Sequence, residues 1–436
     1  MLDRWFRLQA QGTTFRREVV AGLTTFAAMA YILAVNPQIL SATGMPFGAL
    51  ITATALASAI MTAAMGVATN YPIALAPGMG MNAFFAYTLC QAHGIPWRAA
   101  LALTFLSGVC FLAATLGGIR RRLLEAIPRE MKAAITGGIG LFLVFIGLQK
   151  GGLIVASPAT LVTLGRVTPA SLLALGGILL CLVLTTRKVP GAVLLTLALV
   201  TLAGLAVRGP DGPLTRLPDH WLSAPASLAP TFLAFDFRYV FTHVGTLLPM
   251  LLTLLFVDLF DNMGTLIGVA SRLGLMDEQG RLPRLGRALG ADACAAMVGS
   301  ALGTSTVTSY IESAAGVEEG GRTGLTALVV SACFLLALFA APLIAMVPAV
   351  ATTPALVVVG LSMAQELKAL DLGDFGTAVP ALLTALLMPL TFSIAEGLAI
   401  GFVAFVVART AQGRSRELTG TAWALAGIFL LHLVFR

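Results

Sequence analysis

Long apolar runs recur along almost the whole chain, and they constrain its fold more than any other feature. From Val19 onward the runs are about 17 to 25 residues long, so each can cross a lipid bilayer as a helix. Of the 436 residues, 58% are hydrophobic and only 11% are charged, which is not the composition of a soluble globular domain. The sequence therefore predicts one integral membrane domain that crosses the bilayer many times.

The apolar runs fall into two sets of seven, separated by a proline-rich polar loop over 208–242. The first set covers 19–40, 48–68, 77–92, 97–119, 132–150, 170–187 and 190–207, and the second covers 243–271, 286–302, 305–320, 323–346, 350–367, 375–391 and 395–410. Because each set holds an odd number of spans, the two halves are inverted relative to one another. The predicted fold class is an all-α polytopic membrane protein with a seven-plus-seven inverted repeat. A last apolar stretch, 418–435, either adds a span or lies on the membrane surface.

Basic residues mark one side of this predicted domain. With the N-terminus placed in the cytoplasm, 20 of the 27 Lys and Arg residues fall in inward-facing segments and six in outward-facing ones. This is the positive-inside pattern, and it explains the net charge of +7 without a nucleic-acid partner. We expect a multi-pass protein of a bacterial-type cytoplasmic (inner) membrane. The five cysteines form no C-x-x-C pair and indicate neither a metal site nor a cofactor.

The third span of each half is interrupted. The first reads "APGMGMNAFFAYT" from Ala76 to Thr88, and the second opens with "GTSTVTSYIESAAG" from Gly303 to Gly316. Proline and glycine disfavour helix, so each segment is expected to enter as extended chain and to become helical near Asn82 or near Ser309 to Glu312. Such backbone persists at membrane depth only where protein or water satisfies its N–H and C=O groups. Two breaks at matching positions of inverted halves therefore indicate a central substrate site.

Three carboxylates, Asp258, Asp261 and Glu312, are expected deep inside these apolar runs. Asp258, Asp261 and Thr265 share one helical stripe of "LLFVDLFDNMGTLIG", and Glu312 is expected in the first turn of a half-helix. A charge at the bilayer centre costs about 2.5 to 3.5 kcal/mol, so these groups must face a wet cavity, pair, or be partly protonated. Burial and mutual repulsion raise carboxylate pKa values, which suits Asp258 and Asp261 to proton coupling.

Other polar and aromatic residues have plainer interpretations. Asp292 is interpreted as an N-cap near the cytoplasmic face, and Glu396 as a first-turn residue near the outer face. For Tyr31 and Asn36, packing in the core and lining of a cavity are equally supported interpretations. Phe84 is a core residue or a cover for a planar ring.

The motifs resemble those of the AzgA-like adenine, guanine and hypoxanthine permeases, in the nucleobase–cation symporter group. The stretches that carry the resemblance are "TTFAAMAYILAVNPQIL", "APGMGMNAFFAYT", "DLFDNMGTLIGVA" and "GTSTVTSYIESAAGVEEGGRTGLTALV". Asp261-Asn-Met-Gly stands where the uracil and xanthine branches resemble Glu-His-x-Gly, and Thr265 stands where uracil permeases place a histidine. These differences favour the purine branch and argue against a histidine relay.

The resemblance implies a core domain, here 15–122 with 243–346, that moves against a gate domain, here 127–207 with 348–411. The loop 208–242 and the segment 412–436 lie outside both. It also implies that the base is held by the third, eighth and tenth spans, with Asn82, Asp261 and Glu312 as its contacts. A homodimer is a further expectation from the resemblance. Phe84, Thr265, Ser309 and Ile311 complete the candidate substrate-binding set.

The predicted function is proton-coupled import of purine bases, in which Glu312 accepts two donors from the flat purine edge. An alternative of the same architecture is a sulfate-like anion transporter, although such a site should avoid several carboxylates. A membrane-embedded magnesium enzyme is a third reading, because Asp258-x-x-Asp261 has the spacing of a magnesium-binding pair. The chain has neither a second acidic motif of this kind nor nearby basic residues, so no enzyme activity is expected.

Overall fold

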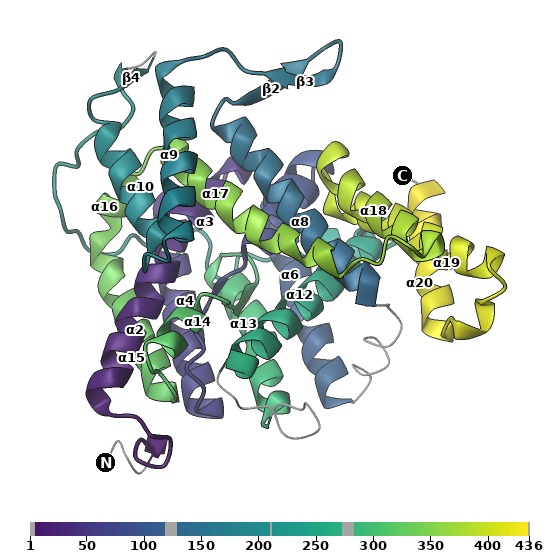
Figure 1. Cartoon of the computed structure of the whole chain (residues 1–436), viewed down its shortest axis with the longest axis horizontal. Coiled ribbons are helices and arrows are strands. Elements are labelled where there is room, and N and C mark those ends of the chain that lie inside the picture. Colours follow the sequence, from purple (N-terminus) through teal and green to yellow (C-terminus); the bar gives the residue numbers. More distant parts are fainter. Residues whose placement is uncertain (1–4, 118–128, 210–211, 273–282, 435–436) are drawn as a thin grey trace.

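The computed structural model describes residues 5–117, 129–209, 212–272 and 283–434 (Figure 1). Within 260–272 the described side chains are those of Asn262, Thr265, Leu266 and Val269. The first half contains α2 (Phe15–Met29), α3 (Ile32–Leu40), the turn η1 (Ser41–Thr43), α4 (Phe47–Thr69), β1 (Leu75–Pro77), α5 (Met79–Ala83), the π-helical η2 (Phe84–Ala92), α6 (Trp97–Leu116), α8 (Arg129–Lys150), β2 (Ile154–Ser157), β3 (Leu161–Leu164), α9 (Pro169–Thr186) and α10 (Ala192–Ala203).

The connecting loop carries the short strands β4 (Arg208–Gly209) and β5 (Gly212–Pro213) and the helix α11 (Phe237–Thr242). The second half contains α12 (Val244–Arg272), α13 (Leu285–Leu302), β6 (Val307–Ser309), α14 (Ser313–Glu318), α15 (Gly324–Ala337), η3 (Leu338–Ala340), α16 (Ala341–Ala345), α17 (Ala349–Ala364), η4 (Gln365–Ala369), α18 (Phe375–Leu390), α19 (Ile394–Ala411), η5 (Ser415–Glu417) and α20 (Gly420–Val434). Each predicted span coincides with a helical segment. Eight helices of the described residues are long and apolar enough to cross a membrane.

Local sequence explains where many of these helices begin. Pro46, Pro96 and Pro348 immediately precede α4, α6 and α17. Thr168 caps α9, because its side chain accepts from the backbone N–H of Ser171 while the Ser171 side chain accepts from the N–H of Thr168. Polar caps satisfy N–H groups that have no partner inside the helix, which matters most where water is scarce.

The helices pack in two groups. In one group, α4 packs against α13 and α15, α6 against α12 and α13, and α2 against α14 and α15. In the other, α8 packs against α17 and α18, α9 against α10 and α17, and α18 against α19. The helices α5 and α12 contact α8, and α3 contacts α17, so these elements lie between the groups. The two groups correspond to a core domain and a gate domain.

The packing repeats itself when the two halves are exchanged. Span 2 of the first half packs on span 4 of the second (α4 on α15), and span 4 of the first packs on span 2 of the second (α6 on α13). Likewise span 5 of the first half packs on span 6 of the second (α8 on α18), and span 6 of the first packs on span 5 of the second (α9 on α17). A pseudo-two-fold axis between inverted halves produces such exchange, so the predicted inverted repeat is confirmed.

Glycine pairs let helices of opposite halves approach closely. A Cβ on Gly324 of α15 would lie 2.1 Å from the carbonyl oxygen of Gly66 on α4. A Cβ on Gly360 of α17 would lie 2.5 Å from the carbonyl oxygen of Gly140 on α8. Small residues at such crossings are the usual means of helix association in membranes.

The last apolar stretch forms α20, which packs along α19. His432 near the end of α20 lies beside Glu396 in the first turn of α19. The two helices are therefore antiparallel, and α20 returns to the side of the molecule where α19 begins. Among the two possibilities left open by the sequence, this arrangement favours an additional span.

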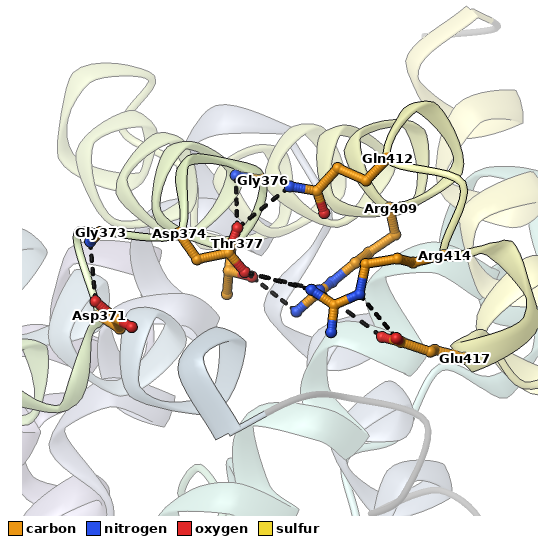
Figure 2. A network of polar contacts seen from close by, with 9 residues as sticks. All are labelled: Asp371, Gly373, Asp374, Gly376, Thr377, Arg409, Gln412, Arg414 and Glu417. Atoms are coloured by element: carbon orange, nitrogen blue, oxygen red, sulfur yellow. Dashed lines mark hydrogen bonds and ion pairs between the residues drawn. The ribbon is translucent and has the colours of Figure 1, made fainter.

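A polar network holds the opposite end of α19 to the start of α18 (Figure 2). The Asp374 carboxylate accepts hydrogen bonds from Thr377 Oγ1 at 2.8 Å and Gln412 Nε2 at 3.2 Å, and it lies 3.7 Å from Arg409. Arg414 pairs with Glu417 at 2.7 Å and with Asp374 at 3.8 Å. Several members are exposed, so the network orients the turn between α19 and α20 more than it stabilises the fold.

Candidate functional site

The two interrupted spans meet in the interior and pair with each other. β1 and β6 form an antiparallel two-stranded ladder in which Leu75 lies opposite Ser309 and Pro77 lies opposite Val307. Because the strands run in opposite directions, α5 and α14 leave the ladder toward opposite ends. The prediction that both third spans contain a short extended segment is confirmed.

The extended backbone is satisfied by neighbouring protein groups. Thr62 Oγ1 of α4 donates to the carbonyl of Leu75 and accepts from its N–H, both at 2.9 Å. The N–H of Ala74 donates to Ser313 Oγ at 3.0 Å, and Tyr310 OH donates to the carbonyl of Pro77 at 2.6 Å. These partners allow non-helical backbone to exist inside the membrane domain.

Glu312 lies directly before α14, at its N-cap position. Its Oε1 accepts a hydrogen bond of 2.7 Å from the hydroxyl of Tyr31, which precedes α3 in the first half of the chain. Glu312 is half-buried, and its neighbour Ile311 is 47% exposed although Tyr310 and Ser313 are buried. This stretch therefore borders accessible space, and Tyr31 fixes the direction of the carboxylate.

Asn82 lies on α5 and is fully buried. Its Oδ1 accepts a hydrogen bond from Ser305 Oγ, in the turn before β6. The Nδ2 of Asn82 is buried and has no hydrogen-bond partner among the residues that the structure describes. A buried donor without a partner costs roughly 1–3 kcal/mol, so this amide is a reasonable place for a ligand acceptor.

Two members of the predicted stripe on α12, Asp258 and Thr265, are buried. Asp258 and Thr265 are 1% and 8% exposed, and Asp258 Oδ1 accepts from Asn262 Nδ2 at 3.0 Å. Asn262 Oδ1 in turn accepts from Thr308 Oγ1 and, at 3.3 Å, from the N–H of Ser309. One amide thus connects the α12 carboxylate to the strand. Asp261 lies on α12, but its side chain falls outside the described part of the structure.

The interpretation of Asp292 as an N-cap near the cytoplasmic face is wrong. Asp292 lies in the middle of α13, fully buried, and its Oδ1 accepts from both the N–H and the Oγ of Ser309 at 3.1 Å. No local pattern indicates this partner, which is 17 positions away across a turn. Ser309, one of the candidate contacts, is therefore hydrogen-bonded to α13.

Of the remaining candidates, Phe84 and Asn36 are buried packing residues, whereas Tyr31 contacts Glu312. Phe84 is fully buried in the apolar core at the start of η2. Asn36 is also fully buried, and its Nδ2 donates to Thr54 Oγ1 at 2.7 Å and Thr304 Oγ1 at 2.8 Å. Asn36 thus fastens the turn before β6 to α4, whereas Tyr31 contacts the candidate site itself.

Sequence reasoning did not identify Asn262, Ser305 or Thr308 as members of this site. Asn262 follows Asp258 by four positions on the same stripe, so helical spacing was an available signal. Ser305 and Thr308 lie in the interrupted segment, but their partners come from distant parts of the chain. No local pattern indicates such pairs.

The arrangement offers both hydrogen-bond acceptors and a donor to a small planar ligand. The carboxylate of Glu312 has about four lone-pair positions, of which Tyr31 uses one, and Asn82 Nδ2 supplies a donor. A separate cavity of about 410 Å³ lies between the β4–β5 hairpin and the start of α17. It is lined mainly by glycine, proline and apolar residues and contains none of these candidates.

The similarity to known proteins extends over nearly the whole chain. A model of the Permease family matches residues 16–400. The chain is 42% identical to the adenine permease AdeP of Escherichia coli, covering 100% of this chain and 96% of that protein. It is also 42% identical to the guanine/hypoxanthine permease PbuG of Bacillus subtilis, covering 100% of both.

Solved structures share the fold at low sequence identity. The transmembrane domain of the cyanobacterial bicarbonate transporter BicA aligns with a TM-score of 0.66 at 18% identity, covering 89% of this chain and 98% of that one. The transporter SLC26A9 aligns with a TM-score of 0.60 at 12% identity, covering 91% of this chain and 65% of that one. This similarity supports a seven-plus-seven inverted-repeat transporter with core and gate domains.

Proposed function

The chain belongs to the Permease family, and from that premise we propose that it imports purine nucleobases in symport with protons across a bacterial-type cytoplasmic membrane. Family membership makes it a multi-pass membrane transporter, so the magnesium-enzyme reading is set aside. Relatives named for adenine and for guanine and hypoxanthine match over its full length, which supports a purine as the substrate. The N-terminus is proposed to be cytoplasmic, as the distribution of basic residues indicates.

The observation that carries the proposal is the position of Glu312 and Asn82 on either side of the β1–β6 ladder. Glu312 follows β6 and is held by Tyr31, and Asn82 follows β1 with a free buried amide. A purine edge presents N–H donors beside ring acceptors. We assign Glu312 to the donors, and Asn82 to an acceptor.

The remaining candidates are proposed to surround these two contacts. Asp261 would bind another edge of the base, and Phe84, Thr265, Ser309 and Ile311 would shape the site. Ser309 and Thr265 are buried, whereas Ile311 is exposed beside Glu312 and so is the better placed to touch a ligand.

Proton coupling is assigned to Asp258 and Asp261. Asp258 is buried near the middle of α12 and shares a hydrogen bond with Asn262, which itself contacts β6. Protonation would remove a charge from the helix that lines the site and would ease its passage through an apolar barrier. A change in the protonation of Asp258 would alter its hydrogen bond with Asn262 and therefore the contacts of Asn262 with β6.

Transport is proposed to follow an elevator movement of the core domain against the gate domain. We assign 15–122 and 243–346 to the core, and 127–207 and 348–411 to the gate, with 208–242 external and 412–436 C-terminal. The boundaries near 122 and 127 lie outside the described residues. The separate packing of the two helix groups supports this division. Homodimer formation stays a prediction from the family resemblance.

An anion substrate is not favoured. The likeness to a bicarbonate transporter lies at 18% identity and therefore concerns the fold alone. Asp258 and Glu312 lie near the ladder, and carboxylates would repel an anion bound there.

Uptake of labelled hypoxanthine, guanine and adenine into proteoliposomes tests the function. We expect uptake of at least one base to be driven by an inward proton gradient and to collapse on addition of an uncoupler. Uptake that ignores the uncoupler would contradict proton coupling. Absence of uptake for all three bases, together with competition by sulfate in a binding assay, would contradict the substrate class.

A further inference from the structure

A buried histidine–carboxylate cluster lies apart from the candidate substrate site. His93 follows η2, Glu396 lies in the first turn of α19, and His432 lies near the end of α20. Glu396 and His432 are 1% and 6% exposed, and the His93 side chain is 12% exposed. Three segments that are distant in sequence therefore bring titratable side chains together, and the transport mechanism uses none of them.

The three side chains point their ligand atoms at one another. Glu396 Oε1 lies 3.6 Å from His93 Nε2 and 3.5 Å from His432 Nε2. The three ligand atoms lie within 4.8 Å of one another. A tetrahedral zinc ion with ligands at about 2.0–2.1 Å separates its ligand atoms by about 3.4 Å, so the two histidine–glutamate distances already match.

The hydrogen bond of His93 prepares its other nitrogen for a cation. Its Nδ1 lies 2.8 Å from the backbone carbonyl of Thr88, which can only accept, so Nδ1 carries the proton. In the neutral ring, Nε2 then has a lone pair directed at the Glu396 carboxylate. The Nε2 atoms of His93 and His432 are buried and have no hydrogen-bond partner among the described residues. Facing lone pairs repel unless a proton or a metal cation lies between them, and separations of 3.5 and 3.6 Å are longer than a hydrogen bond to a carboxylate.

We propose that His93, Glu396 and His432 form a binding site for a divalent transition metal ion of the zinc class. Two imidazole nitrogens and one carboxylate oxygen are a zinc-type ligand set, and a fourth position is left for water on the side of the partly exposed His93. The backbone carbonyl of Thr88 orients the ring in the way that outer-shell partners orient metal-binding histidines. Imidazole ligands favour zinc, copper or nickel over magnesium or calcium.

The cluster lies where a bound metal ion would affect the movement of the core domain against the gate domain. η2 continues α5, which we place in the core, whereas α19 belongs to the gate and α20 packs along it. A bound ion would tie the two domains together at this end of the molecule. This consequence rests on the proposed elevator function, whereas metal binding does not.

Metal binding to the purified full-length protein tests the site directly. Titration with Zn²⁺ by calorimetry, and with Co²⁺ by the visible absorption of tetrahedral cobalt, should give one saturable site, with no binding of Mg²⁺. His432→Ala and Glu396→Gln should each weaken Zn²⁺ binding by at least about 100-fold, because each removes one of three protein ligands. His432→Cys should restore binding, because a thiolate is also a zinc ligand.

His220→Ala and His243→Ala are matched controls, because both histidines are exposed and far from the cluster in sequence. They should leave the affinity unchanged, and thermal unfolding should show that every variant is folded. No zinc binding by the wild-type protein, or equal binding by folded His432→Ala, would overturn the proposal. In proteoliposomes Zn²⁺ should slow purine uptake by the wild type but not by His432→Ala. Failure of this last result alone, with binding intact, would contradict the tie between domains and not the metal site.

Discussion

Three acidic side chains near the paired strands are each oriented by the donors placed around them. Glu312 is oriented by a tyrosine hydroxyl, Asp258 by an amide, and Asp292 by a serine and its backbone N–H. The sequence identified Glu312 and Asp258 because a carboxylate inside an apolar run requires a partner. It misjudged Asp292, because burial of that residue depends on how α13 packs against β6.

Tyr31→Phe removes the hydroxyl that holds Glu312 Oε1. A hydrogen bond to a charged group contributes about 1.5–3 kcal/mol, so we expect purine affinity to fall about tenfold or more. Isothermal titration of the purified protein measures this change. Tyr239→Phe, on the half-buried α11, serves as the control and should bind normally. Unchanged affinity in Tyr31→Phe would show that the hydroxyl does not orient the binding carboxylate.

Asp374→Asn tests the polar network shown in Figure 2. Hydrogen bonds from Thr377 and Gln412, together with the charge of Arg409, lower the pKa of Asp374 below its ordinary value of 3.8. A lowered pKa stabilises the folded state above the ordinary pKa, and this contribution disappears as the pH falls through the lowered pKa.

We therefore expect the wild type to unfold at a slightly higher temperature than Asp374→Asn at every pH above about 5, with the difference vanishing only in strong acid. Thermal unfolding in detergent across this range measures it. A difference that appears only between pH 6 and 8 would point to another titrating group.

At the scale of elements, the helices could largely be predicted, because apolar length and the positive-inside pattern are properties of consecutive residues. The interruptions near Pro77 and Gly303 were visible for the same reason. The pairing of β1 with β6 joins positions more than 200 residues apart, and only the matching location of the two breaks pointed toward it. The contacts of Asn262 with Thr308 and Ser309, and the cluster around Glu396, had no comparable signal.

Asp292→Ala should destabilise the paired strands. It leaves the buried hydroxyl of Ser309 without its acceptor, and the Ser309 N–H keeps only the longer contact of 3.3 Å to Asn262 Oδ1. A lost partner of this kind costs roughly 1–3 kcal/mol. We expect a lower unfolding temperature and weaker purine binding, whereas Asp292→Asn should retain most of the stability because Oδ1 remains. The exposed Asp371→Ala, in the loop before α18, is the control. Equal stability of the Ala and Asn variants would contradict the role of Oδ1.

At the scale of the whole molecule, the inverted repeat follows from span counting, and the packing exchange between halves agrees with it. The sequence also suggested which spans meet at the centre. The contacts between the two helix groups could not be read from the sequence, since both groups present similar apolar surfaces.

A disulfide between the groups tests whether they must move. A Cβ on Gly80 of α5 would lie 3.9 Å from the Cβ of Ile139 on α8, which is within the range of disulfide geometry. We expect the double variant Gly80→Cys/Ile139→Cys to lose uptake on oxidation and to recover it on reduction. Each single variant under the same oxidant is the control. Full uptake by the cross-linked protein would contradict an elevator movement of α5 against α8.

Equilibrium binding of hypoxanthine, guanine and adenine to the purified protein is the most direct test of the central claim, that the paired breaks hold Glu312 against a purine edge. The wild type should bind at least one base saturably, and Glu312→Gln should weaken that binding by about 10- to 100-fold through loss of a charged acceptor. Glu366→Gln, a change in the short η4 segment outside the site, should bind as the wild type does. Wild-type affinity in folded Glu312→Gln would contradict the claim.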